Sequence, residues 1–302
     1  MARKMIKWLG IGIGMVAGVL LIAAIVLVIM TNRKSNVVYT FETANLSIPT
    51  DEASIAEGER LVTLRNCTGC HGEDLAGNVL IEDALFGTYI ATNLTGGQNS
   101  VTANYTPTDW DRAIRHGVGT NGKALWVMPS FEYNQISDRD LELMIAYLES
   151  IPAVDQAEPY PAPKVGPLAM LLLNTGQIPF LSAETIDHDT PAQADVVAEV
   201  SAEYGAYLAT TCQGCHQANF SGGPMPGTPP EHPPAANLTP AGHLANWTQD
   251  DFIKTLRTGV TPEGKTLNPD YMPWTITQRM TDDELAALWL YFNSLPPVTS
   301  GS

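Results

Sequence analysis

The chain repeats one five-residue sequence, and this repeat constrains the fold more than any other feature. Cys67-Thr68-Gly69-Cys70-His71 recurs 145 residues later as Cys212-Gln213-Gly214-Cys215-His216. Collinear blocks at nearly constant offset indicate a duplicated module. We therefore expect two homologous modules, at 50–154 and 198–297, joined by a linker at 155–197. The other repeated blocks are 93–95 with 237–239, 114–118 with 256–260, 128–129 with 272–273, and 141–152 with 285–296.

Each module is predicted to be helical, so the expected fold class is all-α. In the last block of each module, apolar residues recur at helical spacing behind a Ser or Thr that has an acidic residue three positions on. A middle helix is expected from Thr108 to Gly117 and from Thr248 to Gly259, and a first helix leads into each cysteine pair. The last helices are predicted to start at the capping pairs Ser137 with Asp140 and Thr281 with Glu284, and to end before Pro152 and Pro296.

The N-terminal segment is predicted to be a membrane anchor. Residues 8–30 are uncharged, and a helix of that length is about 34 Å long, enough to cross a bilayer. Residues 1–34 carry five basic residues and no acidic one, which leaves 11 basic against 32 acidic residues in the rest. A cleaved signal peptide is the alternative, but the run is long and Arg33 and Lys34 follow it at once. We expect a retained anchor at 1–34 with the N-terminus inside.

The linker holds an apolar stretch at 165–181. Pro167, Gly176 and Pro179 interrupt this stretch, which makes it too short and too broken for a second membrane span. Its length and its lack of basic residues favour packing between the two modules over a position in the membrane interface.

The histidine after each cysteine pair decides the chemistry of the pair. CxxC alone is compatible with a redox disulfide or with half of a zinc site. CxxCH is the attachment signature of c-type haem, in which the two thiols form thioethers and the histidine coordinates iron. A zinc site would join pairs that are 145 residues apart, and the duplication argues against that. We predict two covalently attached haem c groups, held by Cys67, Cys70 and His71, and by Cys212, Cys215 and His216.

A methionine followed by proline lies at the same place in each module. Met128 is 57 residues after His71, and Met272 is 56 residues after His216. Repetition at equal distance favours axial ligands over core filler, and His–Met ligation closes both axial positions, which suits electron transfer. Met225 also precedes a proline, but it has no counterpart in the first module. The histidines without a repeated counterpart, which we set aside as ligands, are His116, His232 and His243.

With these motifs the chain resembles the cytochrome c superfamily, in particular the two-haem and three-haem cytochromes c that serve membrane-bound dehydrogenases. The resemblance covers both modules and implies axial ligation by His71 with Met128 and by His216 with Met272. It also implies close packing of the first helix on the last, which would place Gly58 against Tyr147, and Gly205 against Tyr291. Those subunits usually carry three haems and a C-terminal anchor, so the resemblance does not name the partner enzyme.

Arg115 and Arg257 are repeated basic residues in acidic modules. A haem brings two propionates, and arginine suits bidentate pairing with carboxylates. Contact with propionate and ordinary surface salt bridges are equal alternatives for both residues.

The sequence predicts a membrane-tethered dihaem cytochrome c that transfers single electrons between redox proteins, as part of a respiratory, photosynthetic or dehydrogenase chain. No catalytic residue is expected, and the chain is predicted not to be an enzyme. Haem attachment outside the cytoplasmic membrane, which the family implies, places the modules on the periplasmic side of a single-pass anchor. The net charge of −16 argues against nucleic acid as a partner. The alternative is a dihaem peroxidase-like enzyme with one displaceable axial ligand.

Overall fold

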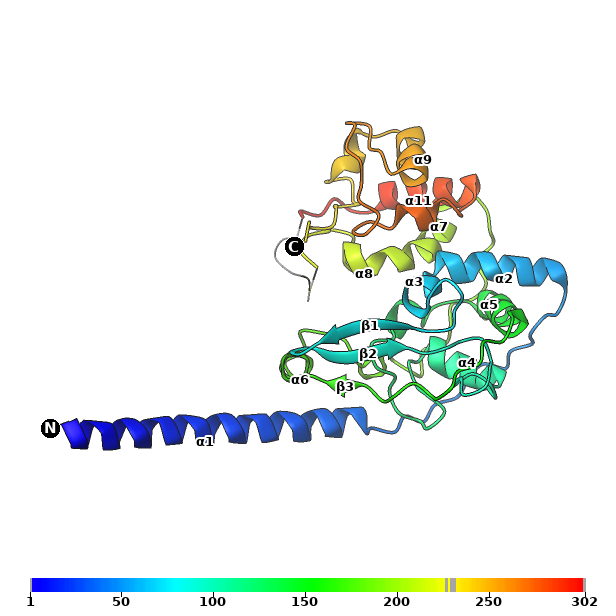
Figure 1. Ribbon diagram of the computed structural model, residues 1–302. Helices are drawn as coiled ribbons and strands as arrows, with labels where there is room; N and C mark the ends of the chain where they lie inside the picture. Colours follow the sequence, from blue (N-terminus) through cyan, green and yellow to red (C-terminus); the bar gives the residue numbers. More distant parts are fainter. Residues whose placement is uncertain (1, 226–227, 229–231, 301–302) are drawn as a thin grey trace.

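The computed structural model describes residues 2–225, 228 and 232–300. A long N-terminal helix, α1 (Ala2–Ser35), projects as a single rod from the first of two modules that lie against each other (Figure 1). Helices dominate both modules, which confirms the predicted helical architecture. The all-α prediction needs one correction, because the first module also contains a small sheet of three strands.

The first, middle and last helices of the two modules correspond and follow in the same order. In each, a first helix crosses the last one, and a middle helix completes the apolar core. The first module contains α2 (Glu52–Leu64), α3 (Cys67–His71), α4 (Pro107–Ile114), η1 (Ser130–Glu132) and α5 (Asp138–Ser150). The second contains α7 (Ala202–Ala209), η3 (Thr210–Cys212), α8 (Gln213–His216), η4 (His243–Asn246), α9 (Gln249–Thr258), α10 (Trp274–Thr277) and α11 (Asp282–Ser294).

A glycine allows the first and last helices of each module to touch. A Cβ added to Gly58 would lie 2.0 Å from the Leu143 carbonyl oxygen and 3.0 Å from Tyr147 Cβ. A Cβ added to Gly205 would lie 2.0 Å from the Ala287 carbonyl oxygen. No side chain fits at such distances, so only glycine permits this approach. The packing that the family resemblance implied is confirmed in both modules.

Most of the predicted helix ends are confirmed. Thr248 and Thr281 both form capping boxes, and Ser137 accepts a hydrogen bond from Asp140 N–H. Gly259 ends α9 with a φ of 68°, the left-handed conformation that favours glycine.

The start and end predicted for the middle helix of the first module are wrong by two residues each. α4 begins at Pro107, and Thr106 caps it rather than Thr108. Proline suits the first position of a helix because its missing N–H would have no partner there. The helix also ends early, with Arg115 rather than Gly117 at its C-cap.

Two of the three strands of the missed sheet lie between the first CxxCH motif and residue 93, and the third lies in the linker. Strands β1 (Asn78–Asp83) and β2 (Gly87–Ala91) form an antiparallel hairpin, and β3 (Lys164–Val165) from the linker adds to β2. The equivalent stretch of the second module is rich in proline, which cannot donate to a strand ladder. Its described part has only a single bridge, between Gly223 and Ala235.

The apolar stretch of the linker does not pack between the modules as predicted. It forms α6 (Pro167–Asn174), continues to η2 (Ser182–Glu184), and packs on the first module. Its cluster holds no residue of the second module among the described ones. The buried members of the cluster are Val118, Ala124, Ala169, Leu173, Ile178, Leu181 and Ala183.

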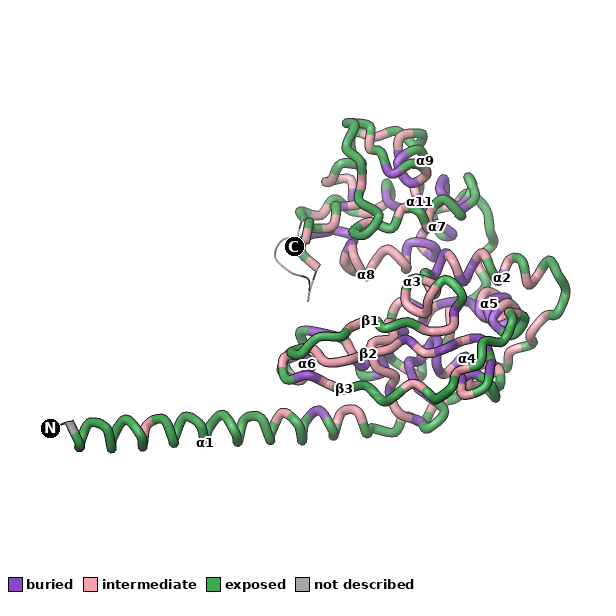
Figure 2. The backbone as a smooth tube through the Cα atoms, viewed as in Figure 1, coloured by how far each residue is buried: buried purple, intermediate pink, exposed green. Residues whose placement is uncertain are grey.

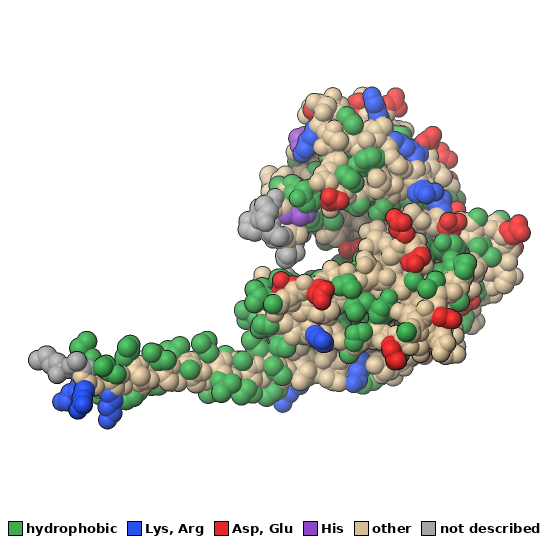
Figure 3. All heavy atoms as spheres, in the orientation of Figure 1, with side chains coloured by type: hydrophobic (Ala, Val, Ile, Leu, Met, Phe, Trp, Pro, Cys, Tyr) green, Lys and Arg blue, Asp and Glu red, His purple; other side chains and the backbone are tan. Residues whose placement is uncertain are grey.

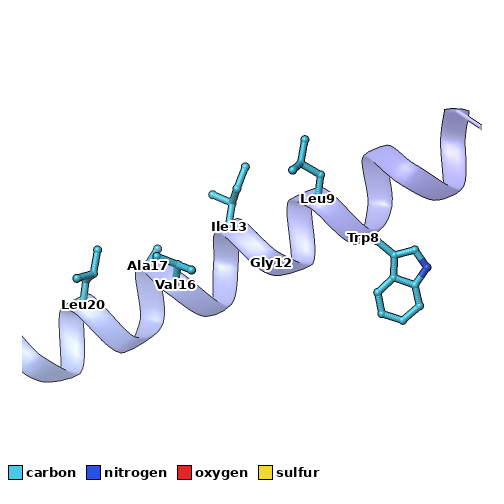
Figure 4. Close-up of a pocket in the computed structure, with 7 residues that line it drawn as sticks. All are labelled: Trp8, Leu9, Gly12, Ile13, Val16, Ala17 and Leu20. Carbon is cyan, nitrogen blue, oxygen red and sulfur yellow. The ribbon is translucent and has the colours of Figure 1, made fainter.

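Among the helices of the described residues, α1 is the one that is long and apolar enough to cross a membrane. Figure 2 shows it exposed along nearly its whole length, and Thr31, near its end, is its one buried residue among those described. Figure 4 shows the side chains of one stretch, from Trp8 to Leu20, projecting outward from the bare helix. This arrangement fits the predicted anchor.

Candidate haem sites

Each histidine of the repeated motif is held by a backbone carbonyl. His71 Nδ1 lies 2.6 Å from the Thr92 carbonyl oxygen, and His216 Nδ1 lies 2.7 Å from that of Ala236. A carbonyl oxygen can only accept, so the ring proton is on Nδ1 and Nε2 is left to bind a metal. Burial lowers the pKa of both histidines, which keeps the rings in the neutral state that ligates iron.

The repeated Asn-Leu-Thr block fixes these carbonyls. Asn93 follows Thr92, and its side-chain amide donates to the Val154 carbonyl oxygen at 2.8 Å. Asn237 follows Ala236 and donates to the Val298 carbonyl oxygen at 2.7 Å. Both asparagines are buried. The block therefore ties the partner of each histidine to the chain that leaves the last helix, which explains why it occurs in both modules.

None of the four cysteines forms a disulfide within the described residues. Burial raises the pKa of Cys67 to about 12 and that of Cys212 to about 11. The first cysteine of each pair contacts the apolar core of its own module. Free thiols on an apolar surface, next to a histidine with an open Nε2, are what a covalently bound haem needs.

Each predicted methionine ligand packs on the same apolar core as the first cysteine of its module. The loop of Met128 is held by the linker: Val127 N–H donates to the Phe180 carbonyl oxygen at 2.7 Å, and the Ser182 hydroxyl donates to the Met128 carbonyl oxygen. The loop of Met272 is held within its own module, where Trp274 N–H donates to the Met272 carbonyl oxygen at 2.7 Å. Each methionine thus lies on the same core as the cysteine of its module, and ligation of iron by Met128 and Met272 stays a prediction.

The two candidate arginines have different surroundings. Arg115 is 2% exposed and pairs with Asp111 at 3.0 Å and with Asp138 at 2.8 Å. Arg257 is partly exposed, donates to the Gln278 carbonyl oxygen and pairs with Asp282 at 2.8 Å. Carboxylates of the chain thus bind both guanidinium groups, and propionate contact stays a prediction.

Two family models match the two modules. The model described as Cytochrome C oxidase, cbb3-type, subunit III matches residues 53–148, and the model described as Cytochrome c matches residues 202–296. The chain contains two cytochrome c domains. It therefore carries two covalently bound c-type haems, as the paired motifs predicted.

Relatives that match most of this chain are cytochrome subunits of dehydrogenases. The cytochrome c subunit of the quinone alcohol dehydrogenase of Gluconacetobacter polyoxogenes is 28% identical over 276 residues, which cover 82% of this chain and 57% of that protein. The fructose dehydrogenase cytochrome subunit of Gluconobacter japonicus is 27% identical over 80% of this chain and 53% of its own length. This chain thus spans little more than half the length of these subunits. The comparisons support an electron carrier rather than a catalytic subunit.

Two further comparisons concern dihaem proteins and solved structures. A diheme cytochrome c-type protein of Cereibacter sphaeroides is 26% identical over 284 residues, 82% of this chain and 88% of that protein. Reduced cytochrome c4 from Pseudomonas stutzeri matches with 17% identity and a TM-score of 0.22, covering 83% of this chain and all of that one.

The two cytochrome c domains meet in a reciprocal way. Arg60 of α2 binds Glu284 at the start of α11, with 2.8 Å between Nη1 and Oε2. The Tyr207 hydroxyl of α7 donates to Asp140 Oδ2 at 2.6 Å and accepts from Ser137 N–H at 3.2 Å, at the start of α5. Each domain therefore supplies a side chain to the N-terminus of the other domain's last helix.

Arg65 lies at the centre of this junction, two residues before the first motif. It is 4% exposed, and its Nη1 donates to Thr210 Oγ1 at 3.2 Å, just before the second motif. Its guanidinium lies 5.2 Å from the centre of the Tyr207 ring, and its carbonyl oxygen accepts from the Tyr133 hydroxyl at 2.9 Å. The segments that lead into the two motifs are thereby joined directly.

Glu132 of the first domain lies against the second motif. Its Oε1 is 2.1 Å from where a Cβ on Gly214 would be, so the carboxylate lies directly against the backbone of that motif. Burial raises the pKa of Glu132 to about 7. Burial and then the charge of Glu132 raise the pKa of Cys70 and of Cys215, which places this carboxyl within electrostatic reach of both motifs.

Sequence reasoning missed Glu132 and Tyr207. Glu132 corresponds to Ile276 in the second module, so the duplication gives no signal for it. Tyr207 acts on the other domain, and only the tertiary arrangement reveals that contact. The carbonyls that hold the histidines were within reach of prediction, because both precede a repeated asparagine.

Proposed function

We propose that this chain is a membrane-anchored electron carrier, with His71 and Met128 as the iron ligands of one haem and His216 and Met272 as those of the other. Each bound haem supplies a centre that accepts and releases one electron. The cysteines Cys67 and Cys70, and Cys212 and Cys215, would hold the two haems covalently. Coordination closed on both sides leaves no site for a substrate, which suits electron transfer rather than catalysis.

One observation carries this proposal. In both modules the histidine presents Nε2 because a carbonyl holds Nδ1, and the methionine packs on the apolar core that the first cysteine contacts. A dihaem peroxidase-like enzyme needs one site that differs in its ligands, and the two modules offer the same donors. Repetition of the full donor set therefore favours a carrier.

The junction between the domains supports transfer of electrons from one haem to the other. Arg65 and Thr210 join the segments that lead into the two motifs, and Glu132 touches the second motif from the first domain. Buried and bonded contacts of this kind hold the two motifs at a fixed separation. Electrons would enter at one domain and leave at the other without any movement of the chain.

The partner that fits best is a membrane-bound dehydrogenase. The relatives named above are cytochrome subunits of alcohol and fructose dehydrogenases. Anchoring by α1 would hold both domains on the periplasmic side of the membrane, beside such an enzyme. The acidic domains would steer the encounter with a basic face on a redox partner, and that steering weakens with salt.

Carbon monoxide tests the ligand assignment without any knowledge of the partner. The reduced, haem-loaded chain should bind carbon monoxide slowly or not at all at both haems, because methionine occupies the sixth position. Met128→Ala and Met272→Ala should each open one haem to rapid binding. Rapid binding by half of the haem in the unaltered chain would instead favour the peroxidase-like alternative.

Purification from native membranes in mild detergent tests the partner. The proposal expects a dehydrogenase subunit to copurify in stoichiometric amount and to reduce the haems when its substrate is added. Isolation of the chain alone, with no reduction by any membrane dehydrogenase, would contradict the role in a dehydrogenase complex.

A further inference from the structure

The apolar segment of the linker leaves one side of its helix uncovered. Residues 165–181 contain no charged residue, and α6 lies within them. Ala169 and Leu173 are buried against the first domain, whereas Leu171 is 45% exposed and Pro167 is exposed as well. A contiguous apolar surface of this kind marks a contact with a partner or with lipid.

α6 is fixed beside the end of α1. Thr31 of α1 is 3% exposed, and its hydroxyl accepts a hydrogen bond of 2.8 Å from the Asn174 side chain, which ends α6. One turn further along α1, Lys34 pairs with Glu184 of η2 at 2.7 Å. Apolar packing and two polar contacts therefore hold α6 at a defined level along α1 (Figure 1).

That level coincides with the far edge of a bilayer crossed by α1. The uncharged run begins at Trp8, a residue type common at membrane interfaces. At 1.5 Å per residue, Leu27 and Thr31 lie about 29 and 35 Å from Trp8 along the helix. The hydrocarbon core of a bilayer is about 30 Å thick. α6, which is bonded to Thr31, would therefore lie where hydrocarbon gives way to headgroups.

The turn between β1 and β2 extends the same surface. Leu168 N–H donates to the Leu85 carbonyl oxygen at 3.0 Å, and Gly166 N–H donates to that of Phe86 at 2.9 Å. Leu85 itself is 56% exposed. Figure 3 shows hydrophobic side chains gathered on the first domain where α1 leaves it. Two separate segments thus present apolar side chains at one level.

We propose that α6 and the β1–β2 turn form a second membrane contact, in which Leu171 and Leu85 enter the outer headgroup layer of the bilayer. The proposal rests on the anchoring by α1 proposed above. Interfacial helices that bind unaided usually carry Lys or Arg on their polar face, and α6 has neither. Attachment to α1 replaces that attraction, because it keeps α6 at the bilayer at high effective concentration. With two contacts, the first domain could not rotate about α1.

A spin label can locate Leu171 relative to the lipid. The haem-loaded full chain carrying Leu171→Cys would be labelled with a nitroxide and placed in nanodiscs of phosphatidylethanolamine and phosphatidylglycerol. The haems occupy the four natural cysteines, so only the new thiol reacts. Collisions with oxygen, which concentrates in lipid, should exceed those with a water-soluble nickel chelate several-fold.

Two matched labels complete the experiment. Val197→Cys, at a site that is 70% exposed in the later part of the linker, should show the opposite preference for the nickel chelate. Leu20→Cys reports the span itself and should favour oxygen most strongly. A label at 171 that behaves like the one at 197 would overturn the second contact, and so would one shielded from both reagents, since protein would then cover it. A nickel-accessible label at position 20 would instead refute the anchoring by α1.

Discussion

The two modules hold their methionine loops by different means, although their motifs and helices correspond. In the first, linker residues Phe180 and Ser182 bind the backbone on either side of Met128. In the second, Trp274 supports the loop from inside the module, with its indole N–H donating to the Leu267 carbonyl oxygen at 3.1 Å. A backbone bond to the methionine carbonyl is common to both, from Ser130 N–H at 2.9 Å and from Trp274 N–H at 2.7 Å. The comparison teaches that the two modules share the predicted ligand residues, whereas the side chains that support the methionine loops come from different parts of the chain.

The stretches after the two CxxCH motifs differ in the same way. Both have nearly the same length, 21 residues between His71 and Asn93 and 20 between His216 and Asn237. The first stretch forms a hairpin whose strand β2 pairs with β3, and β3 is followed in the chain by α6. The second stretch is proline-rich. Within the part of the chain that the structure describes, only the first module therefore has a strand edge to which the linker adds.

The largest difference is expected from the paired arginines. Arg115→Ala would leave Asp111, 1% exposed, without its partner, and breaking a buried ion pair costs about 3–5 kcal/mol. Arg257→Ala removes a partly exposed pair, which costs about 0–1 kcal/mol. Urea unfolding of the two haem-loaded variants, followed by haem absorbance, measures both. Equal losses would show that the two arginines have equivalent roles, as propionate binding by both would require.

An intermediate effect is expected from Glu132, which has no counterpart in the second module. Its pKa of about 7 in the folded chain lies above the value of about 4.3 in the unfolded chain. Between these two pKa values the folded protein keeps a proton on Glu132 that the unfolded chain has lost. Protonation of Glu132 therefore stabilises the folded state, and this contribution to the free energy of unfolding is lost as pH rises through 7. Between pH 5 and pH 8, the free energy of unfolding of the wild-type chain should fall by about 1–2 kcal/mol more than that of Glu132→Gln, allowing for partial exposure of the carboxyl.

Unfolding by urea at both pH values tests this dependence. The matched control is Glu149→Gln on the exposed side of α5, which should keep the pH dependence of the wild-type chain. A Glu132→Gln variant with unchanged pH dependence would mean that this carboxyl is ionised throughout the range.

The smallest effect is expected from the supports of the two methionine loops. Ser182→Ala removes the hydrogen bond to the Met128 carbonyl, and Trp274→Phe removes the one to Leu267. Each lost bond should cost about 0.5–1.5 kcal/mol. The near-infrared band of methionine ligation should weaken for the first haem alone in Ser182→Ala, and for the second haem alone in Trp274→Phe. Weakening of both bands in one variant would contradict separate supports.

The sequence predicted those features that local chemistry or the duplication determines. The CxxCH motifs, the caps at Thr248 and Thr281 and the glycine crossings all depend on short spacings, and the repeat doubles each signal. The wrong cap at Thr108 was avoidable, since Thr106 is followed by proline, which favours the first position of a helix. Both threonines have an aspartate three residues on, so that spacing alone did not separate them.

The missed features depend on contacts between distant segments. β3 consists of two residues that become a strand only because β2 lies beside them. The position of α6 also depends on distant contacts. Its apolar residues predicted that it would be packed against protein, but they did not show that the first module would be its partner. Tyr207 reaches a helix start about 70 residues away in sequence, across the junction of two modules that no pattern had placed together.

Redox titration of the haem-loaded chain with Met128→His and Met272→His tests the central claim most directly. Histidine keeps each iron six-coordinate but removes the thioether, which raises the potential in the unaltered chain. Each substitution should lower one of two one-electron midpoints, on the order of 0.1 V within the range of about 0.8 V that axial ligands cover, and leave the other in place. Unchanged midpoints in either variant would contradict the assignment of that methionine as an iron ligand.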